Sequence, residues 1–394
     1  MVLCLTCCNQ NRDNIRNTAE NSDLFVINTD KAEKVEYMFL SEICSEIKTI
    51  ILETKDDILL GWVDIVQVYK DFIFVLDRMN TGLYAYNKEG KFIRKYGGRG
   101  GGPGEYLSIS DFTIDGENEI VYLLDSEMNQ ILKYEIVTGK YVDKVLIENN
   151  KINFSYIQYN NGRLYGAGDY YRESENGCMV HEINIFTGKS TQCWLDIKQY
   201  NKGWNGRIRR MNESFFYVRN QEPFKFVDYF MDTIISFGKD GASPFAVLQD
   251  KDWISPKRVS QLKEIIDKEE FEGLSSFLGD FSYNIGGYLE WTDHMLFRYR
   301  KKSDYCYVLH NINTNNTKTA KFLIDDIGFN EKIVNHIVCS DADGFYEIID
   351  GWILERVLEQ VKEEGYMKKN LDKYEEILNL PEDTNPIIFY YKYK

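Results

Sequence analysis

The sequence is poor in proline and contains no long apolar run. Six prolines stand against 28 glycines in 394 residues, which favours tight turns over rigid linkers. A helix that spans a bilayer needs ~20 consecutive apolar residues, and the chain nowhere provides them. We therefore expect no transmembrane helix.

Positive charge is also scarce. The 47 Lys and Arg residues face 62 Asp and Glu residues, which gives a formal net charge of −15. Nucleic-acid binding depends on cations that neutralise phosphates, and an anionic lipid surface attracts basic segments. We therefore expect no nucleic-acid partner and no membrane binding through surface charge.

Sequence motifs for metal binding and nucleophilic catalysis are missing. There is no Gly-x-Ser-x-Gly nucleophile elbow. Zinc sites need clustered ligands, whereas no histidine lies four residues from another or beside a cysteine; the four are His181, His294, His310 and His336. We expect no metal and no cofactor. Paired carboxylates for glycoside hydrolysis remain open, because their spacing is spatial and not sequential.

The cysteines show no metal-like pairing. Three crowd the N-terminus and five are scattered: Cys44, Cys178, Cys193, Cys306 and Cys339. A hairpin turn at residues 187–190 would place Cys193 opposite Asn184 and Cys178 opposite Gln199, which is too far for a bridge. We therefore predict no disulfide and interpret the scattered cysteines as small buried apolar side chains.

Aromatic residues make up 14% of the chain, which suits pleated, half-buried strands, and their pattern repeats. One copy comprises residues 72–77, 83–87 and 90–92, and the next comprises residues 120–125, 131–135 and 139–141. Asp77 and Asp125 are 48 positions apart, as are Tyr86 and Tyr134. A period of about 40–50 residues with four strands is typical of a β-propeller.

Weaker copies continue to the C-terminus. They lie at residues 163–189, 215–241, 295–317 and 344–349, with a terminal strand at 386–393. The fold class we predict is all-β: a six-bladed β-propeller of four-stranded antiparallel blades with two helical insertions. The ring must close to shield its end blades, and we expect an early strand at residues 35–40 to pair into the last blade.

The two helical insertions are expected near residues 255–272 and 351–380. In the first, Ser255 and Pro256 mark a helix start, and apolar residues then follow at helical spacing. Insertions in repeat proteins tend to gather on a binding face. The alternative, to which we give equal weight, is that these helices only cover blade edges.

The most specific stretch is a glycine run at residues 97–104, followed by Glu105 and Tyr106. It leads into a strand pattern and not into a helix or a Gly-Lys-Ser/Thr motif, so we do not expect it to cradle a phosphate. The run resembles the inter-blade loop of NHL-type repeats. With residues 111–115, 232–237 and 385–390, the chain resembles the six-bladed propeller lipoproteins of Bacteroidetes. The resemblance implies a cell-envelope location and no settled activity.

Residues 5–8 resemble a bacterial lipobox, in which an aliphatic residue and two small ones precede a lipidated cysteine. We interpret residues 1–23 as a lipobox remnant and a flexible tether, and residues 24–394 as one propeller domain. Lipid on Cys8 would be the whole membrane anchor, with the protein on the outer membrane of a bacterial envelope. The alternative is a chance cluster of cysteines.

Carboxylates recur at equivalent strand ends, at Asp77, Asp125 and Asp169. A ring of carboxylates could bind Ca²⁺, which prefers oxygen ligands. A strand-end Asp more often accepts N–H bonds from the following turn. We favour the turn role, because the same turn chemistry recurs in each repeat.

One arginine-rich loop is unusual in so acidic a chain and predicts a binding site. The candidate ligand-binding residues are Tyr170, Tyr171, Arg172, Trp204, Arg207, Arg209 and Arg210. Arginine forks suit carboxylates, and a Trp face stacks on sugars or cations. The alternative is ordinary charge balance on an exposed loop.

Together these features favour a cell-envelope binding or scaffold propeller that catalyses no reaction. Its partner would be a glycan, a peptide or another envelope protein. The alternative is a carbohydrate hydrolase or lyase with its site in the propeller funnel, because one fold can host many activities. Two facing carboxylates or a histidine cluster in the channel would favour the enzyme.

Overall fold

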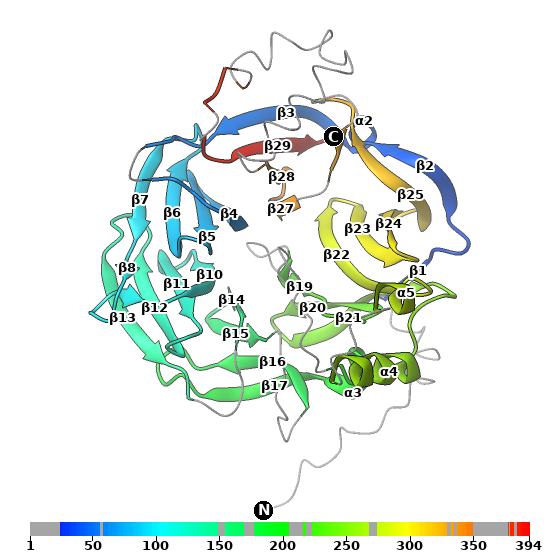
Figure 1. The fold of residues 1–394 in the computed structure, drawn as a ribbon, viewed down its shortest axis with the longest axis horizontal. Coiled ribbons are helices and arrows are strands. Elements are labelled where there is room, and N and C mark those ends of the chain that lie inside the picture. The colour runs from blue at the N-terminus through cyan, green and yellow to red at the C-terminus, as the bar shows by residue number, and fades with distance from the viewer. Residues whose placement is uncertain are drawn as a thin grey trace, which may run out of the picture.

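The computed structural model describes residues 24–55, 58–148, 154–168, 177–204, 216–217, 223–267, 274–328, 332–334, 337–349, 377, 379–381 and 384–394. Six antiparallel blades are arranged around a central axis (Figure 1). The all-β, six-bladed propeller expected from the sequence is confirmed. Within the described ranges, no helix is both long and apolar enough to cross a bilayer.

The first two blades show the repeat most clearly. Their strands are β4 (Val63–Tyr69), β5 (Phe72–Asp77), β6 (Gly82–Asn87) and β7 (Phe92–Tyr96), then β10 (Ile109–Asp115), β11 (Ile120–Asp125), β12 (Gln130–Glu135) and β13 (Tyr141–Leu146). β11 and β12 follow β5 and β6 at the same spacing that separates Asp77 from Asp125. At that spacing the counterpart of Phe92 is Lys140, but β13 begins at Tyr141. The turn before β13 is therefore slightly longer than the turn before β7.

The weaker sequence copies form the other four blades. Blade 3 contains β14 (Tyr156–Asn160), β15 (Arg163–Ala167), β16 (Cys178–Ile183) and β17 (Ser190–Asp196), and blade 4 contains β18 (Phe216–Tyr217), β19 (Phe224–Phe226), β20 (Thr233–Gly238) and β21 (Gly241–Gln249). Blade 5 contains β22 (Ser282–Trp291), β23 (His294–Lys301), β24 (Asp304–Asn311) and β25 (Asn316–Asp325), with β26 (Lys332–Ile333) paired to β25. Blade 6 contains β27 (Ile337–Ser340), β28 (Gly344–Ile349) and β29 (Ile387–Tyr393).

The N-terminal segment runs along the outer edges of three blades (Figure 1). It contains β1 (Phe25–Asn28), β2 (Glu33–Phe39), the short helix α2 (Leu40–Ile43) and β3 (Cys44–Ile51). β1 and β2 pair in parallel with β21 and β25, and β3 pairs antiparallel with β29. The prediction that residues 35–40 close the last blade was wrong. Residues 35–39 lie in β2 at the edge of blade 5. An early strand does close blade 6, but it is β3.

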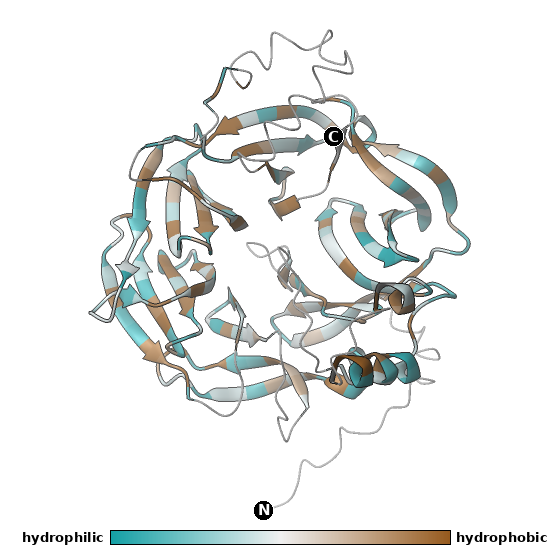
Figure 2. Cartoon of the chain, viewed as in Figure 1, coloured by the Kyte–Doolittle hydropathy of each residue, from teal (hydrophilic) through white to brown (hydrophobic). Residues whose placement is uncertain are grey.

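The core lies between neighbouring blades, and apolar residues are spread over the strands of every blade (Figure 2). β5 and β11 are almost wholly buried, because blades cover both faces of each. Phe74 of blade 1 and Phe112 of blade 2 are fully buried, with ring centroids 6.1 Å apart. Burying one such ring contributes about 1.5–3 kcal/mol. Polar side chains also join the inner strands: Gln67 Nε2 donates to Phe112 O over 2.8 Å, and Asp111 accepts from Ile157 N over 2.8 Å.

The glycine run crosses from blade 1 to blade 2, as the sequence predicts. It contains β8 (Gly98–Arg99) and β9 (Glu105–Tyr106), which pair in parallel before β10 begins. Gly97 has φ +64°, and a Cβ there would overlap the Tyr134 hydroxyl. That hydroxyl donates to Gly104 O over 2.6 Å. Glycine is therefore needed at position 97 for both its backbone conformation and its close approach to Tyr134.

The first helical insertion is α4 (Pro256–Asp267), followed by α5 (Leu274–Leu278). Ser255 O accepts from Arg258 N and Val259 N over 3.0 Å each, which confirms the predicted helix start. Val259 and Leu262 are buried in the core shared by blades 3 to 5. Of the second predicted insertion, residues 351–376 lie outside the described residues.

Candidate functional site

The two faces of the disc carry different connections. In a four-stranded meander, the first and third turns lie on one face, while the middle turn and the link to the next blade lie on the other. We call these the turn face and the loop face. The link between β21 and β22, with α4 and α5, belongs to the loop face. The described ends of β15, β16, β17 and β18 that flank the β15–β16 and β17–β18 connections lie on this same face.

The described part of the arginine-rich loop is anchored at its start. The short helix α3 (Ile197–Tyr200) follows β17, and Asp196 caps it by accepting from Gln199 N over 2.9 Å. The buried Asn201 then donates from Nδ2 to Trp204 O over 3.0 Å. These bonds close a compact turn between blade 3 and the rest of the loop.

Lys202 fixes this turn onto blade 4. Its side chain is buried, and Nζ lies 2.5 Å from Phe230 O and 3.3 Å from Asp232 Oδ2. Both Lys202 and Phe230 have positive φ, at 63° and 59°. Such backbone conformations cost free energy for side-chain-bearing residues and persist where the surroundings enforce them. Trp253 Nε1 adds a bond to Phe230 O over 3.3 Å, so the loop base, blade 4 and the link between β21 and β22 meet at one carbonyl.

Trp204 lies in the core and not on the surface. Only 1% of it is exposed, and its ring meets Phe230 edge-on at 5.1 Å. No Trp204 face is therefore presented for sugar stacking in this conformation, and the residue anchors the loop. The other six candidates lie outside the described residues: Tyr170, Tyr171, Arg172, Arg207, Arg209 and Arg210.

The strand-end carboxylates have the predicted turn role. Asp77 accepts from Asn80 N in the following turn over 3.0 Å and from Gly61 N before β4 over 2.7 Å. Asp125 accepts in the same way from Met128 N over 3.1 Å and Leu107 N over 3.0 Å. Asp169 lies outside the described residues. Over the described part of the chain, no group of three or more His, Cys, Asp or Glu side chains could hold a metal ion.

The described histidines lie in two places, one in blade 3 and two on neighbouring strands of blade 5. His181 is buried in blade 3, where Nδ1 lies 3.1 Å from Ser190 Oγ, and burial lowers its pKa to about 4. His294 and His310 belong to blade 5, and His336 lies outside the described residues. His181 is therefore a neutral core residue at neutral pH.

Two buried carboxylates do approach each other, but inside the core. Tyr391 Oη lies 3.0 Å from Asp325 Oδ2 and 3.1 Å from Glu347 Oε2. Burial raises the pKa of Tyr391, so its hydroxyl keeps its proton and bridges β25, β28 and β29. Asp325 and Glu347 are 0% and 1% exposed. A substrate cannot reach this pair without opening the core.

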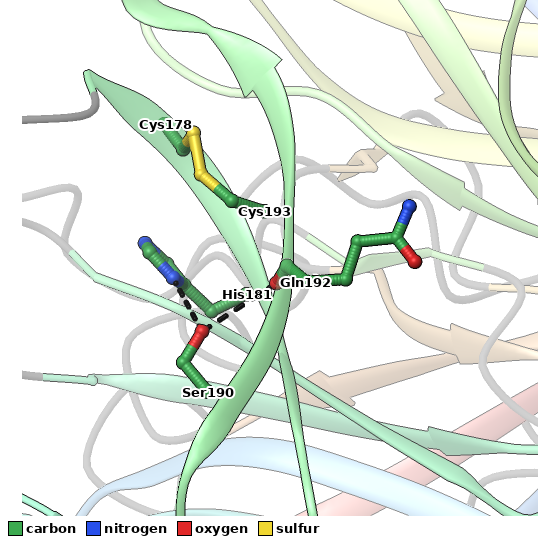
Figure 3. The surroundings of a disulfide bond; sticks show 5 residues. All are labelled: Cys178, His181, Ser190, Gln192 and Cys193. Atoms are coloured by element: carbon green, nitrogen blue, oxygen red, sulfur yellow. Dashed lines mark hydrogen bonds between the residues drawn. A yellow bond between two sulfur atoms is a disulfide. The ribbon is translucent and has the colours of Figure 1, made fainter. Parts of the chain in front are cut away.

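Cys178 and Cys193 form a disulfide, with Cα atoms 5.9 Å apart (Figure 3). The prediction of no bridge was wrong because the strands pair in a different register. Cys193 pairs with His181 instead of Asn184, and Cys178 pairs with Asp196 instead of Gln199. A bulge at Glu182 and Ile183 and the left-handed Leu195 (φ 64°) make this hairpin irregular. Of the cysteines predicted to be buried, Cys44 is buried, whereas Cys306 and Cys339 are only half-buried.

Comparison with known proteins supports the fold and gives no activity. A family model described as "Domain of unknown function (DUF4934)" matches residues 24–392. A solved structure from Bacteroides fragilis, described as a candidate exported protein, has a TM-score of 0.67 at 18% identity and covers 94% of this chain and 99% of its own. A DUF4221 family member from Bacteroides vulgatus has a TM-score of 0.51 at 7% identity, covering 89% and 97%. No protein of curated function matches the chain.

Proposed function

The chain belongs to the DUF4934 family, and we propose that it is an exported, lipid-anchored propeller that binds a carboxylate-bearing glycan on its loop face. The observation that carries this proposal is the fixed base of the arginine-rich loop. Buried Lys202 and Trp204 hold that base against blade 4. Binding residues placed next to a rigid support lose less freedom on binding than residues in a free loop.

The arginines supply the chemistry. Arg207, Arg209 and Arg210 follow the anchored turn shortly after Trp204. Each guanidinium can form two parallel hydrogen bonds to a carboxylate. In a chain with a net charge of −15, a local cationic loop favours an anionic ligand over the rest of the surface.

Export is supported by the disulfide between Cys178 and Cys193. Disulfides persist in oxidising compartments such as the periplasm and the cell surface. The structural relative from Bacteroides fragilis is itself described as a candidate exported protein. With the lipobox-like residues 5–8, these observations support our proposal that the protein lies on the outer membrane.

Neutralising the arginine loop should weaken the binding of an acidic sugar. For the triple variant Arg207→Gln, Arg209→Gln and Arg210→Gln, we expect roughly 100-fold weaker binding of trigalacturonate by calorimetry, since each charge-assisted bond contributes about 1.5–3 kcal/mol before losses. The control replaces Lys70, Lys88 and Lys140 by Gln, because these residues lie in turn-face turns. It should bind like the native protein.

Three results would redirect the proposal. Equal affinities of the two triple variants would contradict a role for the loop. Preference for an acidic hexapeptide over trigalacturonate would identify a peptide partner. Cleavage of the sugar, seen by mass spectrometry, would favour the hydrolase or lyase alternative.

Replacing Cys8 should remove the lipid. We expect radiolabelled palmitate to enter the protein expressed from its chromosomal gene, and Cys8→Ser to abolish the label. Two acyl signals are needed for stable anchoring, so the variant should also leave the membrane fraction. Cys7→Ser is the matched control and should keep the label. A labelled Cys8→Ser variant would refute the anchor.

A further inference from the structure

A polar cavity of about 590 Å³ lies between blades 4 and 5 at the rim of the disc. Its lining comes from three parts of the chain: β1 with the following link to β2, the start of β23, and the hairpin of β24 and β25. Small-molecule sites typically measure about 300–1,000 Å³. None of its lining residues belongs to the described part of the arginine-rich loop, residues 200–204.

One wall of the cavity is held by a hydrogen-bonded chain around His294. Its Nδ1 lies 2.6 Å from Asp293 Oδ1, and its Nε2 lies 3.0 Å from Asn311 Nδ2. Asn311 Oδ1 accepts from Thr314 N and Oγ1 over 2.8 and 2.9 Å. The carboxylate accepts the Nδ1 hydrogen, so Nε2 accepts from the Asn311 amide; this assignment satisfies every partner.

A second part of the lining, at Asn28 on β1, also forms hydrogen bonds. Asn28 donates from Nδ2 to Gln249 Oε1 over 3.2 Å and accepts from Lys31 N over 3.1 Å. Behind His294, the Trp291 ring is stacked at a centroid distance of 5.4 Å. These bonds hold His294, Asn311 and Asn28 in place before a ligand binds, so that part of the lining loses little freedom on binding.

Four polar lining side chains have no hydrogen-bond or ion-pair partner among the described residues. They are Lys31, Glu33, Asn315 and Asn316. One cation and one anion leave this set without net charge. The two amides can each donate and accept, which matches sugar hydroxyls that also do both.

We propose that this cavity binds a short neutral oligosaccharide. The ligand would lie between the β1–β2 link and the β24–β25 hairpin, with Asn315 and Asn316 bonding its hydroxyls. This proposal does not depend on the arginine-rich loop, because the two sites share no residue and belong to different connections.

The test is a titration of the full chain with neutral trisaccharides of glucose, mannose, galactose, xylose and N-acetylglucosamine, read by calorimetry. We expect at least one to bind, and Asn316→Ala to weaken it about tenfold, the loss expected for one or two hydrogen bonds. Ala32→Trp should abolish binding, because Ala32 lines the cavity and a large side chain would fill it.

Matched controls separate the cavity from general effects. Asn160→Ala removes the same amide from a strand of blade 3 outside this cavity, and Ala32→Ser changes the lining little. Both should bind like the native protein, with unchanged thermal unfolding. The proposal fails if none of the trisaccharides binds, if Asn316→Ala and Ala32→Trp bind as well as the controls, or if trigalacturonate competes more strongly at this site.

Discussion

Replacing Asp250 by alanine is expected to lower the free energy of unfolding by about 3 kcal/mol, the scale for breaking a buried charged network. Asp250 follows β21, and its side chain is fully buried. It accepts from Lys301 Nζ over 2.6 Å, Tyr299 Oη over 2.7 Å and Thr29 Oγ1 over 2.9 Å. Ser282 Oγ adds a bond over 3.0 Å. One carboxylate thus joins blade 4, blade 5 and the N-terminal segment.

The contribution of Asp250 should also depend on pH. Burial acts to raise its pKa, but hydrogen bonds from Lys301 and Tyr299 outweigh burial and lower the pKa from 3.8 to about 2. A lowered folded-state pKa stabilises the protein above the unfolded value and loses that effect as pH falls through the folded value. The contribution of ionised Asp250 to the free energy of unfolding should therefore be complete above about pH 4 and should disappear towards about pH 2.

Urea unfolding at several pH values measures both effects. Asp280→Ala is the matched control, since Asp280 is exposed in the same link between blades 4 and 5. It should change stability by less than about 0.5 kcal/mol. An Asp250→Ala variant as stable as Asp280→Ala at neutral pH would show that the network contributes little. The same acid sensitivity in both variants would refute the pH argument.

The blade repeat could be predicted because its determinants are local. Asp77 accepts from a residue 16 positions away, and Asp125 from one 18 positions away. Blades 1 and 2 therefore each carry this turn chemistry within one repeat, and the two aligned copies reveal it. The start of α4 was predictable for the same reason, because Ser255 caps the residues that directly follow it.

The N-terminal strands could not be placed from the sequence. β1 and β2 lie near the start of the chain, whereas their partners β21 and β25 lie in its second half. An amphipathic strand fits the outer edge of any blade, so its pattern does not specify which blade it joins. The Cys178–Cys193 bridge was missed because the turn was predicted too far along the chain. The hairpin closes from Asn184 N to Lys189 O, and a bulge at Glu182 and Ile183 changes the register by one more residue.

The base of the candidate site was misread for a related reason. A Trp followed by arginines fits an exposed binding loop, but Trp204 is buried against Phe230 of the next blade. Nothing in the local sequence identifies Lys202 as an anchor, because its partner Asp232 lies 30 residues further along the chain, in blade 4. Contacts with residues that are distant in the sequence therefore bury side chains whose local pattern predicts exposure.

The polar cavity between blades 4 and 5 was also missed, because its walls come from the N-terminal segment and from blade 5, which are far apart in the sequence.

Removing the disulfide should produce the other large loss of stability. For the double variant Cys178→Ser and Cys193→Ser, we expect about 3 kcal/mol less stability, the scale for a loop closed at a sequence separation of 15. The bond joins β16 to β17, the outer edge of blade 3, and α3 with the anchored loop base follows β17 directly. The loss should therefore reach the loop face as increased amide hydrogen exchange at residues 197–204.

Reduction provides the matched control for this prediction. Under reducing conditions the native protein and the double variant should have the same urea midpoint, because both lack the bond. A difference that persists after reduction would mean that the serines act by another route. Equal midpoints in oxidising buffer would mean that the bridge does not stabilise the fold. A disulfide contributes its stabilisation of about 3 kcal/mol only in a compartment that is oxidising enough for the bond to form. We therefore expect blade 3 and its loop base to reach full stability only in such a compartment.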